Sequence, residues 1–390
     1  GGTIGDIESQ PFLEAIRQLR WELGGSAMNV HLTYVPYLAA AGELKTKPTQ
    51  NSVKQLQGQG IQPDVLVLRT EHELSMDLRR KVAHFCNVDV EGVIQSQDLP
   101  SIYEVPINLS RQGFDIVCLR RLGVVDAPSP RLEPWFRFLH LRQHATGVVD
   151  IALVGKYDLQ DAYKSILESL AHAGIYNNRK VRTHFVNSEQ LTLSNVQERL
   201  GTMSGIVVCP GFGQRGIGGK IVACEYGRTY NVPTLGICLG MQMMVVEFAR
   251  NVLGYADAHS REMDTHTPHN VIDLMEEQKT VTQMGGTMRL GAYDCRLTED
   301  SRAWEIYGEV PLIRERHRHR YEFNNQYRRE FELRGMKCVG VNPDSDLVEI
   351  VEIPAHRWYV GTQFHPEYSS TVLRPHPLFM SFVQSLIPNP

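Results

Sequence analysis

Short runs of apolar residues alternate with amphipathic stretches along most of the chain. In the first part of the sequence, the runs at residues 30–37 and 64–68 have the length and composition of buried strands. Further buried strands are predicted at residues 150–155, 205–209 and 233–237. Because these strands alternate with stretches of helical periodicity, the predicted fold class is α/β with parallel sheets.

The alternation breaks once, in a stretch that contains Asp126-Ala127-Pro128-Ser129-Pro130 and the aromatic run at residues 135–138. Proline-rich, irregular sequence of this kind is typical of a connection between domains. We therefore predict one domain at residues 1–122, a linker at 123–148, and a second domain at 149–390. The aromatic residues of the linker are expected to pack on a neighbouring surface.

The segment Gly236-Ile237-Cys238-Leu239-Gly240 lies between a predicted strand and a helical pattern at residues 241–250. Its two glycines are expected to permit a tight turn from strand to helix. A thiol at the N-terminus of a helix has a lowered pKa, which raises the fraction of thiolate available for attack. Cys238 is therefore a candidate nucleophile.

The downstream segment Gln363-Phe364-His365-Pro366-Glu367 supplies candidate partners for this cysteine. His365 would hold or accept the thiol proton, and Glu367 would fix the tautomer of the imidazole. The alternative is a buried structural cysteine and a surface histidine. That alternative is the better one for an isolated pair, since cysteine is among the most buried residue types. The glycines beside Cys238 and the His-Pro-Glu context favour catalysis.

These two segments resemble the class I, triad-type glutamine amidotransferases, which release ammonia from glutamine through a thioester. A third segment, Pro210-Gly211-Phe212-Gly213-Gln214-Arg215-Gly216, follows a predicted strand at the place of that family's oxyanion loop. The resemblance implies that the backbone N–H groups of Gly211 and Leu239 are the oxyanion donors. Pro210 stands where many relatives have a first glycine. Gly211 keeps the second, where only glycine is expected to let the backbone approach closely enough.

Segments outside the amidotransferase motifs narrow the resemblance to the CTP synthases. Residues 1–19 and 42–50 closely resemble the synthetase domain of that family, and residues 285–291 and 315–322 resemble its amidotransferase domain. The similarity runs over nearly the whole chain in the family's order. It implies a partial Rossmann-like, P-loop-type synthetase domain followed by a class I glutamine amidotransferase domain.

The CTP synthases phosphorylate UTP at O4 with ATP and displace the phosphate with ammonia from L-glutamine. The resemblance therefore implies a cytoplasmic ligase that also binds Mg²⁺, is activated by GTP, is inhibited by CTP, and forms homotetramers and filaments. Two alternatives stay open at this point. The chain could act only as a glutaminase, or only as a nucleotide-binding assembly unit.

The same resemblance assigns roles to individual side chains. Glu262 and Arg318 would hold the ammonium and carboxylate of glutamine, with Gln242 beside the nucleophile. Acidic, basic and amide side chains of the first domain would bind UTP and CTP: Asp6, Glu8, Lys45, Lys47, Gln50 and Lys81. For each of these the alternative is a solvated surface group, since charged side chains are mostly exposed.

The loop after the oxyanion segment matches the region that orders around GTP in the family, and Phe212 and Arg215 are its candidate GTP-loop residues. Relatives often carry glutamate where Gly218 stands, and glycine removes that charge and adds backbone freedom. The alternative is a surface loop without a ligand, since glycine-rich turns are common.

One expected motif is absent from the sequence. The synthetase domain of this family begins with a glycine-rich phosphate loop that ends in Gly-Lys, and the 390 residues contain no such segment. Gly1-Gly2-Thr3 corresponds to a point well inside that domain, so we expect about half of the domain to be missing. The ATP and Mg²⁺ site is accordingly expected to lie largely outside this chain, which is predicted to hold no metal.

Composition excludes several other classes of protein. The net charge of −4 gives no reason to expect a nucleic acid or an anionic membrane as partner. No apolar run approaches the ~20 residues needed to span a bilayer, and no signal peptide pattern opens the chain. Seven cysteines without paired spacing argue against a disulfide framework and favour a reducing compartment.

The run Arg316-His317-Arg318-His319-Arg320 invites a metal or nucleic-acid interpretation. In a strand, alternation would place the arginines on one face and the histidines on the other. Three guanidinium groups beside the histidines oppose a divalent cation by their charge, so metal binding here is disfavoured.

Overall fold

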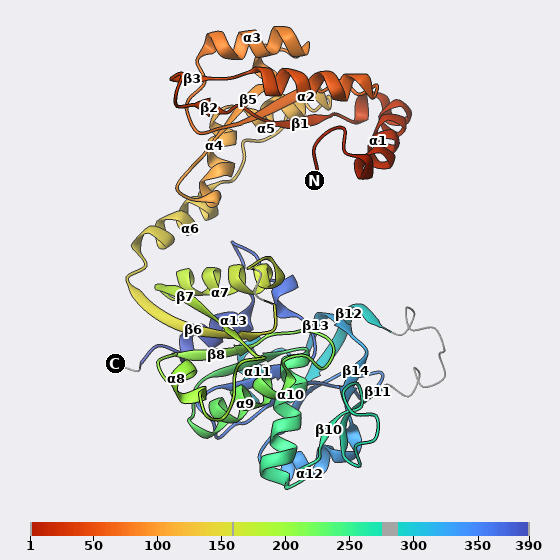
Figure 1. Ribbon diagram of the computed structural model, residues 1–390, viewed down its shortest axis with the longest axis vertical. Helices are drawn as coiled ribbons and strands as arrows, with labels where there is room; N and C mark the ends of the chain where they lie inside the picture. Colours follow the sequence, from red (N-terminus) through yellow and green to blue (C-terminus); the bar gives the residue numbers. More distant parts are fainter. Residues whose placement is uncertain (1, 158–159, 275–287, 389–390) are drawn as a thin grey trace. The chain divides into compact units, whose positions relative to one another are not determined.

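The computed structural model describes residues 2–157, 160–274 and 288–388 (Figure 1). The chain forms two compact units, Gly1–Pro134 and Trp135–Pro390, which are described separately. The division falls inside the segment 123–148 that was predicted to be the linker. Part of that segment is helix α6 (Glu133–His144), where the sequence predicted irregular chain. The aromatic side chain of Phe138 on this helix is fully buried in the second unit, with its ring centroid 6.0 Å from that of Tyr176.

The first unit is built on a small parallel sheet in the order β1-β4-β5. Its strands are β1 (Val30–Tyr34), β4 (Val65–Thr70) and β5 (Val93–Gln97). Its helices are α1 (Gln10–Leu23), α2 (Lys47–Gly58), α3 (Met76–Cys86), α4 (Val105–Arg111) and α5 (Phe114–Arg121). A two-stranded ribbon is formed by β2 (Tyr37–Leu38) and β3 (Glu43–Leu44). The predicted α/β alternation is confirmed here.

The burial predicted for residues 30–37 is wrong for one face of β1. The side chains of Val30, Leu32 and Tyr34 are each more than two-fifths exposed. β1 lies at the edge of the sheet, and the core that β4 and β5 form on this face with α4 and α5 includes none of the β1 side chains. The central strand β4 is buried as predicted.

The second unit contains a nine-stranded sheet in the order β13-β12-β15-β16-β17-β9-β8-β6-β7. The strands from β17 to β7 are parallel: β17 (Tyr359–Thr362), β9 (Thr234–Ile237), β8 (Gly205–Val208), β6 (Gly147–Gly155) and β7 (Arg179–Asn187). An antiparallel extension adds β13 (Leu312–His319), β12 (Arg289–Leu297), β15 (Lys337–Val341) and β16 (Val348–Glu352).

Helices cover both faces of this sheet (Figure 1). Ile206 and Val208 of β8 belong to a core with α9 (Ile217–Thr229) and α10 (Leu239–Phe248). The intervening Val207 belongs to a core with α7 (Lys164–Tyr176) and α13 (Pro377–Ser385). Successive residues of a strand point to opposite faces, so the continuous apolar run of β8 is explained by burial on both sides.

Smaller elements complete the second unit. They are the short helices α8 (Val196–Leu200), α11 (Arg302–Ile306) and α12 (Arg328–Leu333), and a second small sheet formed by β10 (His259–Ser260), β11 (Asn270–Leu274) and β14 (Tyr321–Phe323). Part of one matched motif, residues 285–287, lies outside the described residues.

Candidate active site

Cys238 occupies the connection between β9 and α10, as predicted. The strand ends at Ile237 and the helix begins at Leu239, so the thiol lies at the helix N-terminus. The backbone of Cys238 has φ 54° and ψ −106°, which is unfavourable for a residue with a Cβ atom. Its N–H donates a 2.7 Å hydrogen bond to the carbonyl of Thr362 on the neighbouring strand. The strained conformation is therefore held by the sheet.

The two flanking glycines have a different role from the one expected. The left-handed φ belongs to Cys238, and neither Gly236 nor Gly240 has a positive φ. A Cβ atom on Gly240 would lie 2.0 Å from the carbonyl oxygen of Val208, and one on Gly236 would lie 2.8 Å from the carbonyl carbon of Gly240. These glycines allow α10 to pack closely against the sheet and do not make the turn itself.

The thiol of Cys238 is nearly enclosed, at 3% exposure. Its Sγ lies 3.9 Å from the carbonyl oxygen of Arg318 and 3.7 Å from Nε2 of Gln363. The amide of Gln363 is itself held, because its Oε1 accepts a 3.2 Å hydrogen bond from Gln242. Gln242 also donates to the carbonyl of Tyr321 at 2.8 Å. Gln242, predicted to lie beside the nucleophile, thus orients the side chain of Gln363, which contacts the sulfur of Cys238.

His365 and Glu367 form a buried pair just after β17. Nδ1 of His365 lies 2.7 Å from Oε1 of Glu367, and the imidazole is stacked on the ring of Tyr368 with centroids 4.9 Å apart. Nε2 of His365 has no hydrogen-bond partner among the described residues. Burial alone lowers the pKa of His365, but Cys238 and Glu367 outweigh it and raise that pKa to about 11. The surroundings of His365 therefore favour its protonated, imidazolium form.

A cavity of about 190 Å³ opens beside the thiol. Six residues singled out in the sequence line it: Gly211, Phe212, Leu239, Gln242, Glu262 and Arg318. Cys238 lines it as well, whereas His365 and Glu367 lie outside its lining. The candidate nucleophile, oxyanion donors and glutamine-binding side chains are thus brought together from four separate segments of the chain.

The oxyanion segment is tied to the rest of the pocket through Glu262. Its Oε1 accepts a 3.0 Å hydrogen bond from the backbone N–H of Gly213. At Gly211 an added Cβ atom would make ordinary contacts, the nearest being 3.4 Å from Cε of Lys156. The neighbouring protein atoms therefore leave room for a methyl group. The expected need for glycine concerns the approach of this backbone to the substrate, and it stays a prediction.

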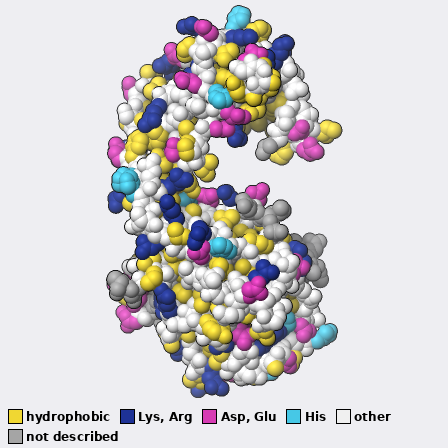
Figure 2. Space-filling model, turned by 60° about the vertical axis from the view of Figure 1, so that its left-hand side comes forward, with side chains coloured by type: hydrophobic (Ala, Val, Ile, Leu, Met, Phe, Trp, Pro, Cys, Tyr) yellow, Lys and Arg dark blue, Asp and Glu magenta, His cyan; other side chains and the backbone are white. Residues whose placement is uncertain are grey.

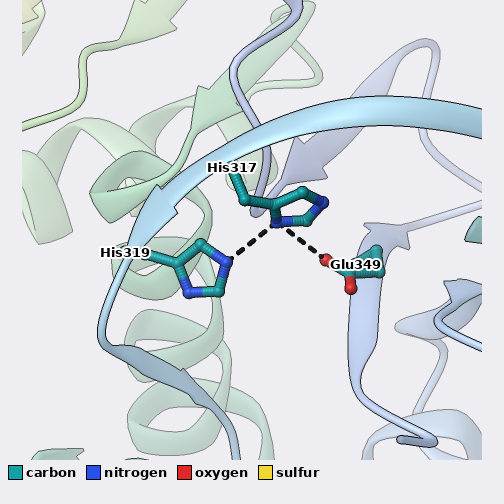
Figure 3. A group of neighbouring side chains, drawn as sticks. All are labelled: His317, His319 and Glu349. Carbon is teal, nitrogen blue, oxygen red and sulfur yellow. Dashed lines mark hydrogen bonds and ion pairs between the residues drawn. The ribbon is translucent and has the colours of Figure 1, made fainter. Parts of the chain in front are cut away.

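Strand β13 shows the predicted alternation of arginine and histidine. From Leu312 to His319 exposed and buried side chains alternate strictly, with Arg316 and Arg318 outside and both histidines inside. Figure 3 shows the inner cluster, in which Nδ1 of His317 lies 2.8 Å from Nε2 of His319 and 3.4 Å from a carboxylate oxygen of Glu349. Burial lowers the pKa of His317 strongly and that of His319 to about 3, and it raises the pKa of Glu349 to about 7.

Two histidines and a glutamate so close together could hold a metal ion. Two contacts oppose that interpretation. The ring nitrogens of His317 and His319 already form a hydrogen bond with each other, and Nη1 of Arg289 lies 2.6 Å from Oε1 of Glu349. Because a guanidinium bound to Glu349 repels a further cation, the cluster is better described as a buried hydrogen-bond network.

The backbone of β13 contacts both candidate catalytic residues, Cys238 and His365. The carbonyl of Arg316 accepts a 2.9 Å hydrogen bond from the N–H of His365, and the carbonyl of Arg318 faces the thiol of Cys238. Sequence reasoning missed this positioning role, although the alternating pattern correctly predicted which side chains point inward.

The predicted nucleotide-binding residues lie in the first unit, in two groups. Lys47 is the first residue of α2, and Nε2 of Gln50 donates to the Thr46 hydroxyl at 3.2 Å. Lys45 pairs with Glu43, a partner that sequence reasoning missed. The hydrogen bond and charge of Lys45, with a smaller effect from Lys81, lower the pKa of Glu43.

The two acidic candidates form the other group, near the start of the chain. Asp6 and Glu8 are exposed, and Asp6 accepts a 2.7 Å hydrogen bond from the N–H of Thr3. Within the described part of the chain no hydrogen bond or ion pair joins Asp6 or Glu8 to the lysines.

Comparison with known proteins agrees with the two-part architecture. Residues 1–124 match the family described as CTP synthase N-terminus, and residues 158–385 match the family described as glutamine amidotransferase class-I. The CTP synthase of Bacteroides thetaiotaomicron is 66% identical over 392 aligned residues, which cover 100% of this chain and 73% of that protein. The chain belongs to the CTP synthase family.

Two further CTP synthases illustrate how far the similarity extends. The enzyme of Porphyromonas gingivalis is 60% identical, with 99% of this chain and 72% of that protein covered. A solved structure described as the glutaminase domain of Trypanosoma brucei CTPS with bound acivicin has a TM-score of 0.58 and 37% identity, covering 61% of this chain and 93% of that one. The second unit therefore shares its fold with a CTP synthase glutaminase domain.

The two candidate GTP-loop residues differ in their relation to the cavity beside Cys238. Phe212 lines the pocket, and its ring lies 6.0 Å from the guanidinium carbon of Arg318. Arg215 does not line the pocket; it forms a 2.9 Å ion pair with Glu189 and lies 5.7 Å from the ring centroid of Tyr157. Gly218 has open space around its Cβ position.

Figure 2 shows basic and acidic side chains interspersed over the visible face, in keeping with the net charge of −4. Within the described ranges, the longest and most apolar helices fall short of what crossing a bilayer requires.

Proposed function

We propose that this chain supplies ammonia from L-glutamine for the amination of UTP to CTP, with Cys238, His365 and Glu367 as its catalytic triad. One observation carries the proposal. Cys238, on a strained strand-to-helix turn, lines a cavity, and His365, whose Nδ1 lies 2.7 Å from the buried carboxylate of Glu367, has a raised pKa.

The chemistry follows from these positions. The thiolate of Cys238 attacks the carboxamide carbon of glutamine, and the N–H groups of Gly211 and Leu239 donate to the oxyanion that forms. His365 gives its Nε2 proton to the leaving nitrogen, so that ammonia departs and a thioester remains. His365 then takes a proton from water, whose oxygen attacks the thioester and releases glutamate and the thiolate. Glu367 holds the imidazole in the orientation that presents Nε2.

The pocket also supplies groups for the amino-acid end of glutamine. Glu262 offers an acceptor for the ammonium group, and Arg318 offers a counter-charge for the carboxylate. Both side chains line the same cavity as Cys238. Phe212 and Arg215 are proposed to respond to GTP, since they belong to the loop that adjoins this pocket.

In the first unit, we assign UTP and CTP binding to acidic, basic and amide side chains: Asp6, Glu8, Lys45, Lys47, Gln50 and Lys81. ATP with Mg²⁺ supplies the phosphoryl group in this family. The 390 residues contain no glycine-rich phosphate loop, so no phosphoryl-transfer step is assigned to them. A cytoplasmic location and a homotetrameric assembly complete the proposal, and the location is supported by seven cysteines that are all free.

The first test is ammonia release from glutamine, with and without GTP, by the wild type and by Cys238→Ala. The wild type should release ammonia, and the variant should not. The matched control is Cys224→Ala, since Cys224 is equally buried but lies in the core between α9 and β17. Ammonia release that persists in Cys238→Ala would contradict the assignment of the nucleophile.

A second candidate is a glutaminase without ligase activity, since the cavity beside Cys238 is lined entirely by residues of the second unit. The two functions separate when UTP, ATP, Mg²⁺ and an ammonium salt are supplied together. CTP formation by this chain would establish the ligase, whereas ammonia release without any CTP would establish the glutaminase. In an enzyme with a full synthetase domain, ammonia-dependent CTP formation should survive Cys238→Ala.

A further inference from the structure

Two buried lysines donate hydrogen bonds to backbone carbonyls of the oxyanion segment. Lys220, on α9, is completely buried, and its Nζ donates to the carbonyl of Cys209 and lies 3.4 Å from the carbonyl of Pro210. Lys156, just after β6, is 6% exposed, and its Nζ donates to the carbonyl of Phe212. Three of the four backbone carbonyls at residues 209–212, all except that of Gly211, therefore face ammonium groups.

Burial of these two charges requires an explanation. Neither ammonium has an ion-pair partner among the residues that the structure describes, and an uncompensated buried charge is costly. Burial lowers the pKa of Lys220 to about 8, against an opposing effect of Cys209. A methionine would fill the same space without this cost. The ammonium groups of Lys156 and Lys220 are therefore expected to have a role beyond filling space in the core.

Peptide geometry indicates what they do. In a planar trans peptide, the carbonyl of one residue and the N–H of the next point in opposite directions. If Lys220 draws the carbonyl of Pro210 toward α9, the N–H of Gly211 must point the other way. The Phe212–Gly213 peptide shows the same opposition. Its carbonyl accepts a hydrogen bond from Lys156, whereas its N–H donates to Oε1 of Glu262, a residue that lines the cavity.

We propose that Lys220 is a positioning residue of the oxyanion hole, which fixes the Pro210–Gly211 peptide so that the Gly211 N–H faces the cavity beside Cys238. This inference rests on the proposed function, because it needs a tetrahedral oxyanion to form there. Lys156 fixes the far end of the same loop. Without Lys220 the peptide would be free to rotate and to turn its carbonyl toward the developing negative charge, which repels it.

The decisive variant is Lys220→Met, which keeps the length of the side chain and removes the donor. Two reactions of the same thiol are compared: glutamine hydrolysis, which passes through an oxyanion, and alkylation of Cys238 by iodoacetamide, which does not. We expect kcat for hydrolysis to fall about 10- to 100-fold, less than the 10²- to 10³-fold typical of deleting a donor outright. The KM for glutamine and the alkylation rate should stay within about twofold, since neither depends on the oxyanion.

An unchanged kcat in Lys220→Met would overturn the inference. A parallel loss of hydrolysis and alkylation would overturn it too, because it would show damage to the thiol or to the fold. If the methionine variant does not fold, Lys220→Leu gives the same comparison with a smaller apolar side chain. The exposed Lys337→Met is the control for the loss of one charge. A wild type that releases no ammonia would instead refute the proposed function itself.

Discussion

Oε1 of Glu367 lies 2.7 Å from Nδ1 of His365, and both side chains are buried. A carboxylate can only accept at this position, so the Nδ1–H tautomer is favoured and Nε2 is left for proton transfer. In Glu367→Gln the amide can present an N–H group instead and stabilise the wrong tautomer. We expect kcat for ammonia release to fall by about 10²- to 10⁴-fold, as measured by initial rates at saturating glutamine.

The chain offers a matched control for this change. Nε2 of His376 lies 2.7 Å from Oε1 of Glu315, which is an equally short and buried pair outside the lining of the cavity beside Cys238. Glu315→Gln should lower the thermal stability and leave kcat within about threefold. If Glu367→Gln retained wild-type kcat, Glu367 would have no role in orienting the base.

Arg318 provides a second prediction, because it faces the cavity while Arg316 on the same exposed face of β13 does not line it. Loss of one charge-assisted hydrogen bond typically costs about 1.5–3 kcal/mol, which corresponds to roughly 10- to 100-fold in affinity. Arg318→Met should therefore raise the KM for glutamine at least tenfold with a much smaller change in kcat. Arg316→Met should change neither constant in steady-state kinetics. Equal effects of the two substitutions would remove Arg318 from the glutamine site.

The strained backbone of Cys238 gives a third prediction, on stability. The conformation at φ 54° and ψ −106° is accessible to glycine but costs other residues about 1–3 kcal/mol. Cys238→Gly should therefore be more stable than Cys238→Ala by about 1 kcal/mol after the entropy cost of glycine is subtracted. At Cys209, whose φ is not positive, the order should be reversed. Denaturant unfolding of the four variants measures both differences.

Much of the site could be predicted because its chemistry is local in sequence. The apolar run and the helical pattern predicted the strand-to-helix connection at Cys238, and the His-Pro-Glu context predicted the pairing of His365 with Glu367. The β13 alternation was predictable for the same reason, since a period of two fixes which side chains point inward. These features depend on neighbours within a few residues.

The features that sequence reasoning missed depend on tertiary contacts. Nothing near Lys220 in the sequence indicates that its ammonium reaches the carbonyl of Cys209, and the Arg289–Glu349 pair joins residues far apart in the chain. The exposure of Leu32 was missed because a strand's apolar run does not reveal whether the strand lies at a sheet edge. The need for glycine at position 240 likewise comes from a tertiary contact, since an added Cβ atom would collide with the carbonyl oxygen of Val208.

Lys220 gives a fourth prediction, on the pH dependence of stability. Burial lowers the pKa of this lysine from 10.5 to about 8 in the folded chain. Between these two values the unfolded state binds more protons than the folded state, so this group makes folding more favourable as the pH rises. At 1.36 kcal/mol per unit, the full effect is about 3 kcal/mol. Lys220→Met lacks the group, so the free energy of unfolding of the wild type should rise relative to that of the variant from pH 8 to 10.5.

Taking the difference between the two proteins cancels all groups that they share, which isolates the lysine. Urea unfolding at several pH values measures it, and the exposed Lys337→Met should give a curve parallel to that of the wild type. A wild-type curve that also runs parallel to that of Lys220→Met would mean that the ammonium of Lys220 is as well solvated in the folded chain as in the unfolded one. The Cys209 and Pro210 carbonyls would then not be held by a desolvated charge, and the loop would need another anchor.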